Sequence, residues 1–355
     1  MSDGFRGRLE QAVESLTPGY FALVMATGII SVGMSLEGFD VISDALLAIC
    51  VAAFVALLAL TAWRIVAYQG AVVQDFTDPR RAFGFFTFVA GTNVLGVRLG
   101  AADWYSATAV LLTLSGLAWL ALGYVVPWTA VLGRQVRPVV ATANGTWFIW
   151  VVASQSVAVA AATIEPVYES SRRELAVIAV MSWSVGVFLY ASTGVLVTLR
   201  LMLYEFGPED LTPPYWVSMG ALAITVLAGS RIVEMADAPM VAVTRGLIAG
   251  LAVVFWAFAT WLFPVLVAAG WWRHVRRGVP LVYEATLWSI IFPLGMYAVA
   301  GIYLGRADDL PIALAVGRGE LWVAFAAWLI VFATMVRHVL ITVFLVPRRQ
   351  EAVAD

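Results

Sequence analysis

The chain has 355 residues, of which 62% are hydrophobic and 12% are charged. A soluble domain carries about 25% charged residues, so this composition predicts an integral membrane protein and excludes an ordinary soluble enzyme. The formal net charge of −2 gives no electrostatic reason to expect nucleic-acid binding.

Ten apolar stretches follow one another along the chain. A helix needs about 20 apolar residues to cross the hydrocarbon core of a bilayer, and these stretches are too long and continuous for the strands of a membrane barrel. We therefore predict an all-α integral membrane fold with ten transmembrane helices. Within a few residues they cover 18–36, 42–63, 82–98, 104–132, 139–164, 175–200, 213–231, 246–272, 285–305 and 321–346. The last stretch carries Arg337 and His338, so its final turns are expected to leave the membrane.

Arginine placement predicts the orientation, because the cytoplasmic loops of membrane proteins carry an excess of positive charge. With both termini inside, most arginines fall on the cytoplasmic side. We predict a cytosolic segment over 1–17, a ten-helix channel or transporter domain over 18–346 and a cytosolic tail over 347–355. The expected location is the cell (plasma) membrane.

The odd-numbered spans begin near positions 18, 82, 139, 213 and 285, which predicts a repeat of one helical hairpin per unit. These spans also carry much of the Gly, Ser and Thr content. We predict five tandem hairpins in which the first helix of each faces a common central pore. The alternative is that the small residues only allow helices to pack closely.

Neutral hydroxyl and amide groups in the odd spans are candidates to line this pore, because they can donate to a passing anion without trapping it. The candidate pore-lining residues are Thr27, Thr92, Asn93, Thr146, Gln155, Ser218, Thr225 and Ser289.

Three arginines, Arg98, Arg231 and Arg306, lie at the predicted outer ends of odd spans. Together they would form an outer vestibule that concentrates anions by field focusing. The alternative is that each one only snorkels to the interface or complements the negative end of a helix dipole.

Ionisable side chains are scarce in the predicted spans. We expect no acidic residue in their interiors, whereas proton relays and metal sites in membranes need ionisable groups there. A single cysteine, Cys50, and two histidines, His274 and His338, exclude a thiolate cluster and a bis-histidine haem. We therefore expect no enzymatic activity, no cofactor and no metal.

Three motifs resemble a known family. The segment PGYFALVMATG over 18–28 is similar to the first span of the tellurite-resistance/dicarboxylate transporter family, NGTWF over 144–148 with the following Gln155-Ser156 to its fifth span, and WSIIFPLG over 288–295 to its ninth. That family includes plant guard-cell slow anion channels, bacterial tellurite-resistance proteins, and fungal malate and sulfite transporters. The resemblance runs in order along nearly the whole chain.

The resemblance implies five tandem hairpins around a pore, with odd helices inside, even helices outside and a homotrimeric assembly. It also implies a phenylalanine gate on the ninth span, for which the matching position is Phe292. The next residue, Pro293, removes a backbone donor and is expected to kink the helix, pushing the phenylalanine toward the axis. An apolar ring in a narrow neutral pore would block it by dewetting.

We therefore expect an anion channel or permease for small anions such as chloride, nitrate or sulfite. Tellurite resistance would follow from expression of such a permease. The alternative is a secondary transporter that couples a C4-dicarboxylate such as malate, or sulfite, to protons. Membrane lipid is the only other expected partner besides further copies of the chain.

Overall fold

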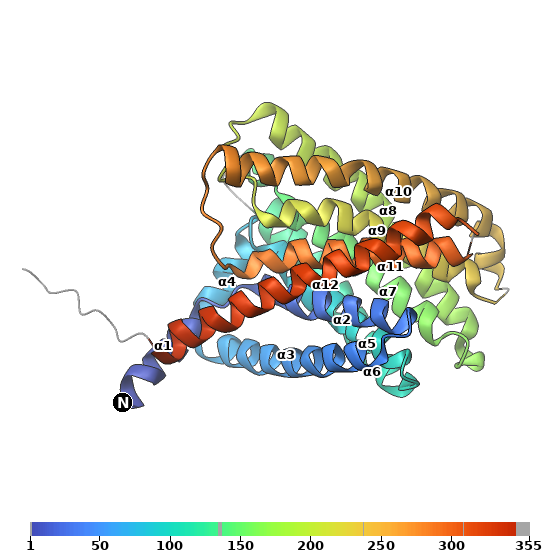
Figure 1. Cartoon of the computed structure of the whole chain (residues 1–355), viewed down its shortest axis with the longest axis horizontal. Helices are drawn as coiled ribbons and strands as arrows, with labels where there is room; N and C mark the ends of the chain where they lie inside the picture. The colour runs from blue at the N-terminus through green and yellow to red at the C-terminus, as the bar shows by residue number, and fades with distance from the viewer. Residues whose placement is uncertain (1, 134–136, 237, 308, 346–355) are drawn as a thin grey trace, which may run out of the picture.

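The computed structural model describes residues 2–133, 137–236, 238–307 and 309–345, and these ranges contain helices and no β-strand. Ten helical segments are long and apolar enough to cross a membrane. Figure 1 shows them side by side in one bundle. The predicted all-α fold with ten transmembrane helices is confirmed.

Five helices form the interior of the bundle, and each is entered through a short 3₁₀ turn. Their most apolar windows are 78–89% buried inside the protein, although they read as membrane spans by composition. These inner helices, with their turns, are η1 Pro18–Phe21 and α2 Ala22–Leu36, η2 Ala82–Phe85 and α5 Phe86–Gly100, η5 Gly145–Trp147 and α7 Phe148–Ile164, η7 Pro213–Trp216 and α9 Val217–Glu234, and η9 Ala285–Leu287 and α11 Trp288–Ala307.

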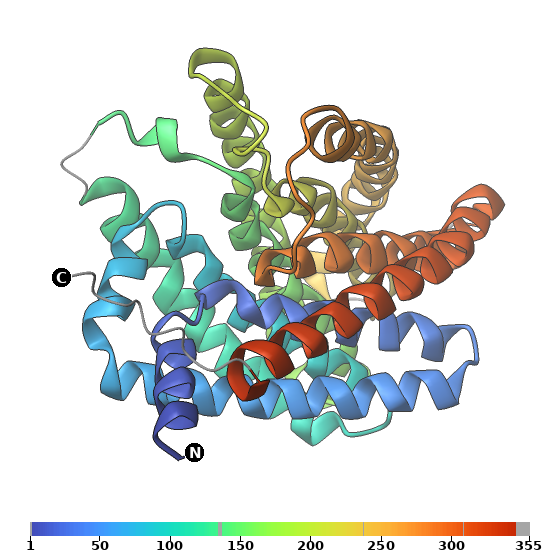
Figure 2. The ribbon, with the colours of Figure 1, turned by 60° about the vertical axis from the view of Figure 1, so that its left-hand side comes forward.

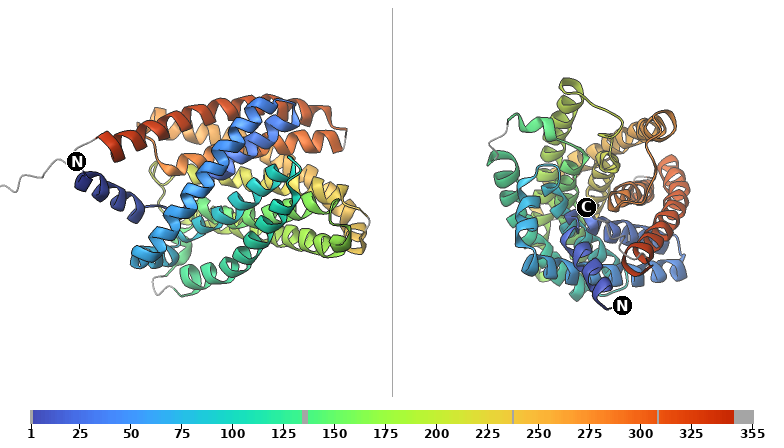
Figure 3. Two further views of the ribbon diagram at one scale, coloured as in Figure 1. Left: turned by 90° about the horizontal axis from the view of Figure 1, so that it is seen from below. Right: turned by 90° about the vertical axis from the view of Figure 1, so that its left-hand side faces the viewer.

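The inner helices close into a ring. Each packs against the next in the order α2, α5, α7, α9 and α11, and α11 returns to pack against α2. The view along the long axis in Figure 3 (right) shows this arrangement. The prediction that the odd spans surround a common axis is therefore confirmed.

Five further spans cover the ring, and their apolar windows are only 11–39% buried. Exposed Val and Leu side chains cover them, as expected for surfaces that face lipid. Each packs against the inner helix that precedes it, which completes five hairpins. The outer helices are α3 Asp40–Ala67, α6 Tyr105–Val126 with η3 Pro127–Leu132, α8 Arg172–Leu203, α10 Pro239–Trp271 with η8 Trp272–Arg276, and α12 Pro311–Val339 with η10 Leu340–Leu345.

Two helices are additional to the spans. α1 (Ser2–Glu14) lies in the segment expected to be cytosolic, and α4 (Gln69–Thr77) follows α3. The Nε atom of Arg8 on α1 donates to the carbonyl of Val343 in η10 at 2.8 Å. The beginning and end of the described chain thus meet at one end of the bundle, as Figure 2 also shows.

The outer helices extend beyond the apolar stretches that predicted them. α12 begins at Pro311, ten residues before the predicted start at 321, so Glu320 lies inside a spanning helix. The expectation that no acidic residue lies within a span is therefore wrong. A hydropathy boundary stops at the first charged residue, whereas the helix extends beyond it, and this extension packs against α11 through Gly317 and Gly301.

Close backbone approach explains several of the small residues. A Cβ atom at Gly145 would overlap the carbonyl of Pro214 in η7, and one at Gly317 would overlap the backbone of α11. Glycine at these positions lets neighbouring helices touch through their backbones. Part of the small-residue content therefore serves packing.

Candidate functional site

A small cavity lies on the axis of the ring and is lined by side chains from all five inner helices. Its volume is about 10 Å³, roughly what one water molecule needs. The lining residues are Ile29 and Val32 of α2, Asn93, Val94 and Val97 of α5, Ser156 and Val159 of α7, Ile224 and Leu227 of α9, and Met296 of α11.

Two polar residues, Asn93 and Ser156, belong to this wall, although the surface that the wall presents to the cavity is apolar. The Nδ2 atom of Asn93 donates to the Oγ atom of Ser156 at 2.9 Å, and its Oδ1 atom accepts from Ser115 of α6 at 2.6 Å. Ser156 in turn donates to the carbonyl of Ala153 at 2.7 Å. The polar pair is thus held in place, and the rest of the cavity wall is uncharged hydrocarbon.

Phe292 lies one helical turn before Met296 on α11, so both side chains share the face that points to the axis. Its ring is 1% exposed. The residues one turn before the cavity on the other inner helices are smaller or more flexible: Met25, Val89, Val152 and Gly220. Phe292 is therefore the bulkiest side chain of this layer, and Gly220 on the neighbouring α9 contributes no side chain.

Pro293 lies inside α11 and contacts α9 directly. A Cβ atom at Gly220 would lie 2.9 Å from Cγ of Pro293. The two helices therefore approach closely at the level of Phe292. The proline also leaves α11 without one backbone donor, and the kink that this produces stays a prediction.

Of the eight residues expected to line the pore, Asn93 alone is among those that line the axial cavity. The hydroxyl of Thr27 accepts from Nε1 of Trp328 on α12 at 2.9 Å, and Nε2 of Gln155 donates to the carbonyl of Trp183 on α8 at 3.1 Å. These two side chains therefore join inner helices to outer ones.

The remaining hydroxyls form local hydrogen bonds within their own segment of the chain. Thr92, Ser218 and Thr225 each donate to a carbonyl three or four residues earlier. Thr146 donates to Oδ1 of Asn144 at 2.6 Å, and Ser289 is buried. Such local bonds satisfy a hydroxyl without any contact to the axis.

Ser156 is a lining residue that the sequence reasoning missed. It lies directly after Gln155, and that pair was noted only as part of a motif. The repeat gives only a partial signal. Counted from the end of the 3₁₀ turn, Ser156 occupies the same position in α7 as Val94 in α5 and Met296 in α11, but the equivalent residues of α2 and α9, Ile30 and Thr225, are not among the lining residues.

The predicted vestibule arginines do not form one open ring. Arg98 is 3% exposed between helices: its Nε atom donates to the hydroxyls of Ser31 and Ser43, and it pairs with Asp44 at 2.8 Å. This guanidinium therefore fastens α5 to α2 and α3.

The other two arginines are less buried. Arg231 pairs with Glu234 at 2.7 Å and lies 5.5 Å from the ring centre of Tyr303. Arg306 forms an ion pair with Glu37 at 2.6 Å, and Arg318 forms a second ion pair with the same Glu37 at 2.7 Å. Their positive charge at this end of the ring is thus partly compensated.

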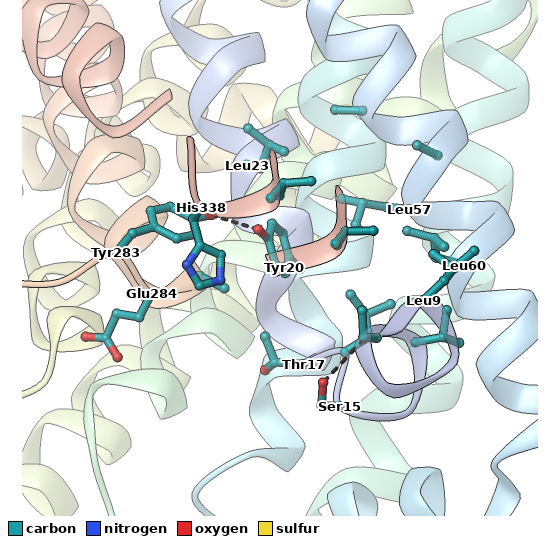
Figure 4. A pocket seen from close by; sticks show the side chains of 18 of the residues that line it. Leu9, Ser15, Thr17, Tyr20, Leu23, Leu57, Leu60, Tyr283, Glu284 and His338 are labelled. Carbon is teal, nitrogen blue, oxygen red and sulfur yellow. Dashed lines mark hydrogen bonds between the residues drawn. The ribbon is translucent and has the colours of Figure 1, made fainter. Parts of the chain in front are cut away.

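At the opposite end, the hydroxyls of Tyr20 and Tyr283 share a hydrogen bond of 2.7 Å. They join the entrances of α2 and α11 beside a cavity of about 540 Å³ under α1 (Figure 4). Burial raises the pKa of Tyr283, so this pair stays neutral at physiological pH. The cavity walls are mostly hydrocarbon, with Leu9 and Leu57 among them, so it lies beside the ring and does not resemble an ion path.

Metal chemistry has no obvious centre in the part of the chain that the structure describes. No group of three His, Cys, Asp or Glu residues lies close enough there to hold an ion. Cys50 is buried, and its thiol lies 3.5 Å from the carbonyl of Val24. The axial cavity with its polar pair is therefore the candidate site.

The chain is similar to known membrane proteins over most of its length. A family model described as voltage-dependent anion channel matches residues 15–336. An uncharacterized membrane protein of Mycobacterium tuberculosis strain H37Rv is 61% identical over 156 residues, 44% of this chain and 79% of the relative. An uncharacterized transporter of Methanocaldococcus jannaschii is 23% identical over 327 residues, 90% of this chain and 92% of the relative.

Proposed function

The chain belongs to the voltage-dependent anion channel family, and from that premise we propose that it passes small anions along the axis of its inner helices. The observation that carries this proposal is the closed ring of five spans with a cavity to which all five contribute side chains. The five inner helices are buried, and the outer spans separate them from lipid. This arrangement suits an anion pathway through the middle of one protomer.

Phe292 is the proposed gate. Its layer holds one bulky ring among smaller or more flexible side chains, so a change in the rotamer of that ring would alter the width of the passage. The cavity that follows is large enough for about one water and is mainly aliphatic. A narrow apolar passage of this kind excludes hydrated ions until it widens.

Asn93 is the proposed contact for the passing anion. One N–H of its neutral amide is bound to Ser156, and the other is the proposed donor, which holds an anion weakly enough for it to leave again. Arg231 and Arg306 are proposed to enrich anions at the outer mouth, with Arg98 shaping that end through its buried bonds. The candidate substrates are chloride, nitrate, sulfite and C4-dicarboxylates.

Glu320 supports a second candidate function, which is proton-coupled transport. A carboxyl group inside a spanning helix is what a proton-coupled transporter needs, and α12 contains one. Coupled uptake of a dicarboxylate or sulfite with protons is therefore the alternative proposal.

The proposed setting is the plasma membrane, with both termini in the cytoplasm and three copies per assembly. The proposed division of the chain is a cytosolic segment over 1–17, a ten-helix domain over 18–346 and a cytosolic tail over 347–355. The meeting of α1 and η10 at one end of the bundle supports a common side for both termini.

The test is a measurement of reversal potentials on purified protein in planar bilayers. Gradients of chloride, nitrate, sulfite and malate are applied in turn, with and without a pH gradient. The channel proposal predicts reversal potentials that follow the anion gradient alone. A reversal potential that moves with the pH gradient would support coupled transport, and the absence of any anion-dependent current would refute both.

A further inference from the structure

Glu320 is an ionisable group at middle depth in the bundle. It is the tenth residue of α12, which begins at Pro311. At 1.5 Å per residue it lies about 14 Å along the helix from Pro311, a distance similar to half the thickness of a hydrocarbon core of about 30 Å. Its neighbour Tyr297 is likewise the tenth residue of the 20 in α11.

A polar cluster on α11 and α10 lies at the depth of this carboxyl group. Tyr297 of α11 is level with Glu320, because Gly317, about one turn before Glu320, packs on the backbone of the antiparallel α11. The hydroxyl of Tyr297 shares a 2.6 Å hydrogen bond with Thr260 of α10, and its ring stacks on Trp256 with centroids 6.5 Å apart. The cluster therefore lies over α11, which packs against both α10 and α12.

The carboxyl group is incompletely satisfied there. Its Oε1 atom is buried, and within the described ranges it has no hydrogen-bond partner. Nε1 of Trp256 is in the same condition. Two buried polar atoms thus lack partners beside one tyrosine, in a region where water is scarce.

The cations of the surrounding helices are occupied elsewhere. Arg318 lies two residues before Glu320, about 200° around the helix, and its Nε atom is 2.7 Å from Glu37. On α11, Arg306 pairs with the same Glu37, and on α10, Arg245 donates to the carbonyl of Met235 near the outer end.

The polar side chains at the depth of Glu320 are neutral. Tyr297 is the titratable one on α11, and it contacts Thr260 and Trp256 of α10. The face of α12 toward α2 carries Leu321 and Trp328, which contact Gly33 and Thr27. Burial of a carboxylate without a cation is costly, so the neutral acid is the form that suits this packing.

We propose that Glu320 is an intramembrane proton-binding site, and that its protonation holds α12 against α11 and keeps Phe292 in the axis. The effect on flux rests on the proposed function. The mechanical link is α11, which carries both Phe292 and Tyr297 and touches α12 through Gly317. When Glu320 loses its proton, the carboxylate is drawn toward water, and α12 loosens from α11. Anion flux therefore rises with pH.

The test compares wild type with Glu320→Gln in liposomes at a series of pH values, equal on both sides. Glutamine mimics the neutral acid, so the variant stays at the low flux that wild type shows at acid pH, whereas wild-type flux rises several-fold toward alkaline pH. Glu320→Asp keeps a titratable group and a pH response. Glu209→Gln, which removes an exposed carboxyl group outside the spans, leaves the wild-type response unchanged.

A second readout does not depend on transport. Infrared difference spectra between acid and alkaline samples report the carbonyl stretch of a protonated carboxylic acid. We expect a titrating band in wild type that is lost in Glu320→Gln. If that band is lost as expected but no variant carries anions, the proposed function fails and the proton site stands. A titrating band unchanged in Glu320→Gln, or a wild-type flux that ignores pH or keeps its pH response in this variant, would overturn the inference.

Discussion

The amide of Asn93 on α5 donates a 2.9 Å hydrogen bond to the hydroxyl of Ser156 on α7. These are the two polar side chains that line the axial cavity, and they come from neighbouring helices of the ring. The bond fixes the amide in one orientation, because Ser115 holds its oxygen from the other side. The amide of Asn93 is thus a neutral, oriented group directly behind the aliphatic surface of the axial cavity.

Replacement of Asn93 by leucine removes this site while keeping a similar volume. We expect anion flux into liposomes to fall by about tenfold, since loss of about 1.4 kcal/mol of favourable contact slows a barrier crossing by that factor. The matched control is Thr92→Val on the same helix, because the hydroxyl of Thr92 is bound to the carbonyl of Phe88. Equal flux in wild type and Asn93→Leu would show that the passing anion does not use this amide.

Gly145→Ala tests the close contact between the entrances of α7 and α9. The added Cβ atom overlaps the carbonyl of Pro214, and overpacking of this kind costs about 1–3 kcal/mol. We expect a lower midpoint of thermal unfolding in detergent. Gly194→Ala on α8 is the control, because a Cβ atom there meets nothing within 4 Å. A midpoint for Gly145→Ala as high as that of the control would contradict the packing described.

The proposed outer vestibule depends on Arg231 and Arg306. Neutralising both to glutamine should lower anion conductance most at low ionic strength, because salt screens exposed charges. Arg6→Gln serves as the control, because the Arg6 side chain is 81% exposed and lies on α1, outside the ten spans. A loss of conductance that is independent of salt would indicate a folding defect instead of an electrostatic role.

The sequence was sufficient to predict the ring. Gly, Ser and Thr gather in the odd spans because closely packed inner helices need small side chains, and the structure buries those spans. Which hydroxyls face the axis could not be predicted, since a hydroxyl in a helix can bind a carbonyl of its own preceding turn, as Thr225 does. Polarity alone therefore does not show which way a side chain points.

Charged residues were the other source of error. Hydropathy ends a span at the first charged residue and therefore predicts a start after Glu320, whereas α12 begins at Pro311. Arg98 was expected in an open vestibule because it ends an apolar stretch, but Ser31 and Ser43 surround its guanidinium. Partners that lie more than 50 residues away in the chain are not visible in a single sequence.

The central claim is that anions travel along the axis of the ring and that Phe292 closes it. The most direct test is anion flux through purified protein in liposomes for wild type, Phe292→Ala and Phe148→Ala. Phe148 is also a buried phenylalanine of an inner helix, but its ring lies 5.3 Å from Tyr190 of α8. We predict that flux rises by about tenfold or more in Phe292→Ala alone, since removal of about 1.4 kcal/mol from a barrier raises a rate tenfold. Unchanged flux in a folded Phe292→Ala protein, or an equal rise in both variants, would contradict the account.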